Sequence, residues 1–192
     1  MHTAHKPTIK NPNGSYYLTL TIVDWVDIFT RETYRQLIIE TLRFYIKNKS
    51  LHVYAYCIMS NHIHMIVNTD MDFRLSDVIR DFKKYTSRRI IEIIQSEPES
   101  RREWLLTHFA KAGAAHSKTK RYKVWQDGNY AIEVYTEYFT WIKVHYIHRN
   151  PVKAGLVHSA EHWKYSSASN YQGMESVLPE VYCLAPPLLK IR

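Results

Sequence analysis

Two apolar runs separated by a two-residue turn constrain the fold of this chain more than any other feature. Residues 51–59 (LHVYAYCIM) and 61–68 (NHIHMIVN) are rich in aromatic and β-branched side chains, and Ser60-Asn61 joins them. Such a pair predicts two adjacent antiparallel strands. Because alternate side chains of a strand share a face, His62 and His64 are predicted to project together.

Two imidazoles on one face are candidate ligands for a divalent metal ion. The alternative is that they simply bond to neighbouring groups, as histidines on strands commonly do. A metal site normally needs a third protein ligand or an open water position. The choice between the two interpretations therefore depends on the rest of the sequence.

The remaining pattern predicts an α+β protein. Thr30 or Thr33 is available to cap the first helix, and Thr136 the last, which Asn150-Pro151 is expected to end. The other predicted elements are a strand at 16–23, helices at 30–48, 75–95 and 137–149, and strand pieces at 122–126 and 131–135.

Residues 96–121 are predicted to be an insertion. Glu97-Pro98 breaks the preceding helix, residues 103–106 suggest a short helix, and residues 113–121 form a small, polar and basic mobile loop. This loop is a candidate phosphate-binding segment or a surface loop without function. The chain from residue 155 onward is predicted to wrap over the sheet domain.

The charge balance favours a polyanionic partner. The 192-residue chain has a formal net charge of +8 and a pI near 9.4. Basic residues on the 75–95 helix are either solvated surface or a phosphate-contacting ridge, with Tyr85 and Thr86 between them. The candidate DNA contacts are Lys83, Lys84, Arg88, Arg89, Lys118, Lys120, Arg121 and Lys123.

Composition also argues against secretion and membrane insertion. The two cysteines do not suggest a disulfide scaffold. The first residues lack the apolar core of a signal peptide, and no run of 18 apolar residues occurs. We therefore expect a cytoplasmic protein with no membrane partner.

Tyr146 and Asn150 are four residues apart on the last predicted helix and therefore point in one direction. A tyrosine that attacks phosphorus needs a metal ion or a base beside it, and an amide oxygen can bind a hard ion. His62, His64 and Asn150 would then be ligands, with Tyr146 as nucleophile. The alternative is that Tyr146, one of 15 tyrosines, packs its ring in the core.

Residues 146–157 (YIHRNPVKAGLV) and 163–167 (WKYSS) resemble the REP-associated tyrosine transposases. These belong to the IS200-like, single-tyrosine branch of the HUH endonucleases. The resemblance extends over residues 16–172 and includes SNHIH at 60–64 and FKKYTS at 82–87. It implies a HUH tyrosine transposase domain at 1–172, followed by a C-terminal extension at 173–192.

The resemblance implies a fold and a set of roles. The fold would be a ferredoxin-like or RRM-like antiparallel sheet with helices on one face and the active site, including the Tyr146 helix, on the other. His62 and His64 match the metal-binding histidines, Tyr146 the nucleophile and Asn150 the residue that completes the site, which takes Mg²⁺ or Mn²⁺. His145 and His148, which flank Tyr146, are weaker candidates for DNA contact.

The implied activity is cleavage and transfer of single-stranded DNA beside a hairpin, through a 5′-phosphotyrosine. A rolling-circle-type nicking protein shares this chemistry but has a different target. A protein that binds hairpin DNA without turnover is the alternative from another class. Monomers and homodimers with shared active sites both occur among such proteins, and the sequence does not choose between them.

Overall fold

The computed structural model describes residues 8–115 and 121–187. In this part of the chain, four strands form one antiparallel sheet in the order β2-β3-β1-β4. The strands are β1 (Tyr16–Thr21), β2 (Leu51–Ile58), β3 (His62–Thr69) and β4 (Tyr130–Glu133). The α+β class and the strand pair around Ser60-Asn61 are confirmed.

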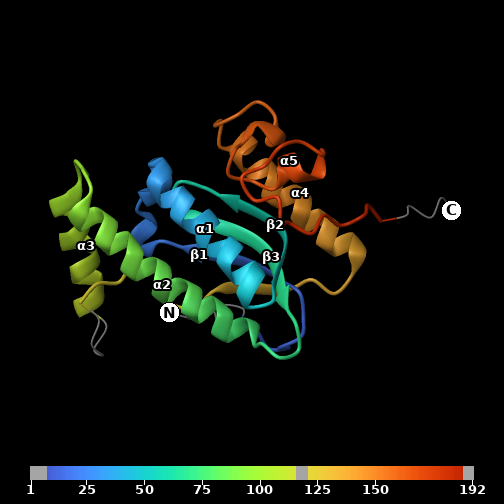
Figure 1. Cartoon of the computed structure of the whole chain (residues 1–192), viewed down its shortest axis with the longest axis horizontal. Helices are drawn as coiled ribbons and strands as arrows, with labels where there is room; N and C mark the ends of the chain where they lie inside the picture. Colours follow the sequence, from blue (N-terminus) through green and yellow to red (C-terminus); the bar gives the residue numbers. More distant parts are fainter. Residues whose placement is uncertain (1–7, 116–120, 188–192) are drawn as a thin grey trace, which may run out of the picture.

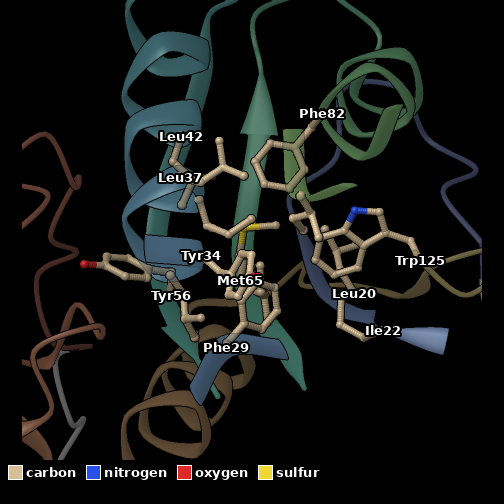
Figure 2. Close-up of a cluster of buried hydrophobic side chains, with 14 of the residues drawn as sticks. Leu20, Ile22, Phe29, Tyr34, Leu37, Leu42, Tyr56, Met65, Phe82 and Trp125 are labelled. Carbon is tan, nitrogen blue, oxygen red and sulfur yellow. The ribbon is translucent and has the colours of Figure 1, made fainter. Parts of the chain in front are cut away.

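Helices α1 (Glu32–Asn48) and α2 (Leu75–Ser96) lie across one face of the sheet (Figure 1). Their apolar stripes meet the inward side chains of β1, β2 and β3. Figure 2 shows this core, in which Leu37 and Leu42 of α1 and Phe82 of α2 surround Met65 of β3. All four side chains are buried. This explains why apolar residues follow helical spacing in α1 and α2 and alternate along β3.

Helix α4 (Glu137–Lys153) packs on the opposite face of the sheet. Its Val144 and Ile147 join Ala55, Cys57 and Ile66 in a second, smaller apolar cluster. Thr136 caps the helix as predicted, since its hydroxyl accepts from the Phe139 N–H at 3.2 Å. The helix that carries Tyr146 therefore lies over the histidine strand.

The predicted end of this helix at Asn150-Pro151 is wrong, because α4 continues to Lys153. Pro151 is buried in the last turn, where it has no N–H to donate to Ile147 O, but Ala154 N–H still donates to Asn150 O and the helix continues past the proline. Asn150 consequently stays helical and on the same face as Tyr146. Thr30 is also not a helix cap: α1 begins after Arg31, which makes no side-chain cap bond.

The segment predicted to be an insertion contains a well-packed helix, α3 (Arg102–Ala114). It is longer than expected because Leu105 and Phe109 are buried in the main core. The predicted mobile loop at 113–121 is therefore partly wrong: Gly113 and Ala114 belong to α3. Residues 116–120, with Lys118 and Lys120, lie outside the described residues.

The chain after α4 covers the open edge of β2. Ile58 N–H donates to Tyr165 O, Ser167 N–H to Tyr56 O and Tyr182 N–H to Val53 O. Leu178 and Val181 are buried in the main core. The tail therefore wraps the domain, and the described part of the predicted 173–192 extension packs against it, which protects an edge strand from pairing with other chains.

Candidate metal and tyrosine site

His62 and His64 lie at the start of β3, on the face that α4 covers. Ile63 between them points into the main core, so the two imidazoles project to the other side, as the alternation predicts. The two Nε2 atoms are 3.0 Å apart. Two ligand atoms at right angles around an octahedral ion with bonds of about 2.1 Å would lie about 3.0 Å apart.

The hydrogen-bond partner of Nδ1 determines the tautomer of His62. Nδ1 of His62 lies 2.7 Å from Oδ1 of Asn61, and the Asn61 amide donates from Nδ2 to Asp27 at 2.9 Å. Because that amide oxygen can only accept, the proton of His62 sits on Nδ1 and Nε2 presents a lone pair. Without an ion, His64 can donate a hydrogen bond to it; a divalent ion would replace that proton.

The imidazole of His64 also has partners at its Nδ1, in this case two hydroxyl groups. Nδ1 of His64 lies 2.8 Å from the hydroxyl of Tyr17 and 3.0 Å from that of Thr19, both on β1. Sequence reasoning missed these two residues, although alternation along residues 16–21 places them on one face. Such partners orient a metal-binding histidine and select its tautomer.

Burial keeps both imidazoles neutral. Together with smaller contributions from the neighbouring His62 and Lys143, burial lowers the pKa of His64 to about 3. Burial also lowers the pKa of His62, and the nearby Asp27 carboxylate only partly offsets this by raising it. A neutral imidazole is the form that binds a metal ion, so the pair is ready to do so at neutral pH.

A third ligand must be of another residue type. Within residues 8–115 and 121–187, no three His, Cys, Asp or Glu side chains form a group that could hold a metal ion. Asn150 supplies an amide oxygen one turn from Tyr146, which suits Mg²⁺ or Mn²⁺. In this structure its Nδ2 donates to the carbonyl oxygen of Tyr146 at 2.7 Å, so the amide is folded back on its own helix.

Tyr146 contacts His64 of the same chain. Its ring centroid is 5.5 Å from that of His64 and 6.0 Å from that of Tyr17, and the side chain is 40% exposed. The predicted contact between the tyrosine helix and the histidine strand is therefore confirmed. A half-exposed phenol beside two metal-binding candidates is accessible to a phosphate.

Two lysines on α4 were missed at the sequence level. The ammonium groups of Lys143 and Lys153 lie 5.8 and 5.4 Å from the centre of the Tyr146 ring. They stand three residues before and seven residues after Tyr146, so the helical spacing places them on its face. Their positive charges favour a phosphate bound beside Tyr146.

Most of the candidate DNA contacts in the described residues line an open groove of about 1220 Å³ between α2 and residues 121–129. Lys84, Arg88, Arg121 and Lys123 line it. Arg89 does not, and it pairs with Glu92 at 2.5 Å. Lys83 also lines the groove, but its ammonium donates to Gln126 O, Gly128 O and Asn129 Oδ1, which holds the 126–129 turn.

His148 has a structural environment rather than a surface one. It is buried, its Nε2 lies 2.8 Å from Ser167 Oγ, and its ring is 5.0 Å from that of Tyr171. Burial, with a smaller contribution from His145, lowers the pKa of His148 to about 4. The imidazole thus joins α4 to the chain segment that covers β2.

This buried imidazole makes stability depend on pH. The unfolded chain takes up a proton on His148 below about pH 6.5, whereas the folded protein resists until about pH 4. Stability is therefore full above pH 6.5 and falls by about 2 kcal/mol for this residue by pH 5. The free energy of unfolding, measured with urea at pH 7.5 and pH 5, should fall less between the two pH values in His148→Gln than in the wild-type protein. An equal fall in both proteins would contradict this assignment.

Comparison with known proteins places the chain in a family. Residues 13–150 match the family model described as transposase IS200 like, so this protein belongs to the IS200-like transposases. The match includes the two histidines, Tyr146 and Asn150. No curated protein matches the chain.

The structure is also similar to a REP-associated tyrosine transposase solved bound to a REP hairpin. The TM-score is 0.58 at 17% identity, with 99% of this chain and 96% of that chain covered, so the two share a fold. A candidate transposase from Deinococcus radiodurans R1 has a TM-score of 0.45 at 13% identity, over 76% of this chain and 95% of that one.

No helix in the described residues is long and apolar enough to span a membrane.

Proposed function

We propose that the protein is a metal-dependent single-stranded DNA endonuclease and strand transferase that acts beside DNA hairpins. The observation that carries the proposal is the contact of Tyr146 with His64, whose Nε2 lies 3.0 Å from that of His62 in the same chain. Family membership supports the same chemistry, and the β-α-β-β-α-β order with strand order β2-β3-β1-β4 supports the ferredoxin-like description of the fold.

In the proposed reaction, the Tyr146 phenol oxygen attacks the scissile phosphorus and forms a 5′-phosphotyrosine. The bond from phosphorus to the 3′ oxygen breaks, the phenol proton passes to solvent, and the leaving oxygen is protonated to a 3′-hydroxyl. A 3′-hydroxyl of the same or another strand reverses the step, so no nucleotide cofactor is needed. Lys143 and Lys153 would stabilise negative charge beside Tyr146.

Mg²⁺ or Mn²⁺, held by His62, His64 and Asn150, would polarise the phosphate when bound. Asn61 would hold His62 in the tautomer that this requires, and the Tyr17 hydroxyl, which can donate or accept, would accept from Nδ1 of His64 when an ion occupies Nε2. Because Tyr146 reaches the histidines of its own chain, one protomer contains all the proposed groups. The proposed chemistry therefore does not require a homodimer.

The test uses labelled single strands that carry hairpins from the DNA beside the gene, incubated with the protein and Mn²⁺. A denaturing gel should show a slow-migrating protein adduct on the 3′-end label and a shortened strand on the 5′-end label, both abolished by EDTA. Retention on a native gel with no adduct in Mg²⁺ or Mn²⁺ would instead establish a hairpin-binding module. Equal cleavage of strands without hairpins would favour a rolling-circle-type nicking protein.

The groove between α2 and residues 121–129 is proposed to contact the hairpin backbone. Neutralising Lys84 or Arg121 with glutamine should reduce the slope of log affinity against log salt concentration by about 0.9 for each phosphate that the side chain neutralises. Lys49→Gln, at the exposed end of α1, is the matched control. Slopes equal to that of the control would remove this groove from the DNA interface.

A further inference from the structure

Two exposed tryptophans, of which Trp25 contacts His62, have no place in the proposed chemistry. Trp25 is 56% exposed and Trp104 is 53% exposed, although indole rings are usually covered. Trp25 belongs to the short helical turn η1 (Val23–Trp25), and Trp104 to α3. Both segments lie at one end of the sheet (Figure 1).

The local fold holds Trp25 outward. Val23 and Val26 on either side are buried in the core, and their backbones are bonded in the turn. Asp24 and Trp25 have φ angles of 50° and 57°, a left-handed conformation that side-chain-bearing residues rarely adopt. Such strain persists only where the surroundings impose it, and it is concentrated at functional sites.

Contacts connect this turn both to the candidate metal site and to α3. The Trp25 ring lies edge-on to His62, with 5.7 Å between ring centres. Asp24 Oδ2 is 3.1 Å from Nε2 of His108, and the His108 ring stacks on Trp104 with 5.2 Å between centres. The neighbouring residues Asp24 and Trp25 thus connect a candidate metal ligand, through Trp25, and an exposed indole on α3, through Asp24 and His108.

We propose that Trp25 and Trp104 form a base-stacking platform for the single-stranded DNA next to the cleaved phosphate. This inference rests on the proposed function. An exposed indole accepts any nucleobase on its face, and rows of aromatic side chains in a positively charged protein are how single strands are held without reading their sequence. Trp25 stacks on the base nearest the scissile phosphate because it touches His62.

The second tryptophan extends the surface away from the cut. Trp104 keeps one face against His108 and leaves the rest of its ring open. Arg101, the residue before α3, donates to Asp27 O at 3.0 Å, so its guanidinium, which is also paired with Glu99 at 3.5 Å, lies near the same turn. The platform thus combines flat apolar rings with a nearby cation, which suits a strand of bases on a phosphate backbone.

The experiment measures binding of a hairpin with a single-stranded flank, in the Tyr146→Phe background so that no cleavage occurs. Trp25→Ala should weaken binding about 5- to 100-fold, the range expected when one base stack is removed. Trp25→Phe should restore most of the affinity, and Trp104→Ala should cost less. Phe44→Ala, an equally exposed aromatic on α1, is the control and should have no effect.

An abasic scan of the flank locates the stacked base. Removing that base should weaken binding by the protein with Trp25 but not by the Trp25→Ala variant. Equal losses in both proteins at every position, or unchanged affinity in Trp25→Ala, would overturn the platform. The covalent adduct formed by the wild-type protein is read separately, so failure of the platform and failure of the proposed function are distinguishable.

Discussion

Phenylalanine at position 146 is expected to abolish the covalent DNA adduct. The substitution removes only the hydroxyl oxygen that would bond to phosphorus, and Tyr17, whose phenol also contacts His64, is buried. Loss of a nucleophile typically lowers a rate by about a million-fold, which leaves no detectable product in an ordinary assay. The measurement is a denaturing gel with end-labelled hairpin strands and Mn²⁺.

Binding should survive this change, because the Tyr146 ring stays in contact with His64 and Tyr17. Affinity for the hairpin, thermal stability and Mn²⁺ binding should therefore stay close to wild type. Tyr138→Phe is the matched control, since Tyr138 is on the same helix and is more exposed. An adduct that persists in Tyr146→Phe, or disappears in Tyr138→Phe, would show that the nucleophile has been misassigned.

Removal of either histidine is expected to have the next largest effect. His62→Ala or His64→Ala deletes one of two imidazole ligands, and even partners of ligands cost about 10- to 100-fold in metal affinity. We therefore expect Mn²⁺ binding, measured by titration calorimetry, to weaken by more than about 100-fold and adduct formation to be abolished. Wild-type protein should in addition gain thermal stability from Mn²⁺, and the variants should not.

His52→Ala is the control for this experiment. His52 is on the neighbouring strand β2 and pairs with Asp70 at 2.8 Å. Since His64 is buried, its alanine variant also leaves a cavity, so unfolding has to be measured alongside. His62 is more accessible and gives the cleaner comparison. Unchanged Mn²⁺ affinity in His62→Ala and His64→Ala would exclude this metal site.

Hydrophobic periodicity was sufficient to predict most of the elements. The two apolar runs around Ser60-Asn61, the Thr136 cap and the Leu75–Ser96 helix each reflect local spacing, which a sequence displays directly. Errors occurred where distant packing prevailed over local preference. Pro151 is held inside α4, and the burial of Leu105 and Phe109 extends the short helix expected at 103–106 into the longer core helix α3.

For the candidate site too, local spacing predicted some features, whereas others depend on contacts between distant parts of the chain. Alternation alone placed His62 and His64 on one face, and helical spacing placed Asn150 one turn from Tyr146. No local pattern could reveal that Tyr17 supports His64 from a strand 47 positions away. Nor could it reveal that Lys83, predicted to bind DNA, uses its ammonium to hold the 126–129 turn.

The sequence by itself determined the kinds of groups available, namely paired imidazoles, a helical tyrosine with its asparagine, and an excess of positive charge. Only the tertiary structure decided that the two imidazole nitrogens lie 3.0 Å apart, that Tyr146 contacts His64, and that the exposed Trp25 contacts His62. The reason is physical: side-chain direction follows from local backbone geometry, whereas proximity depends on how the sheet and α4 pack around a shared core.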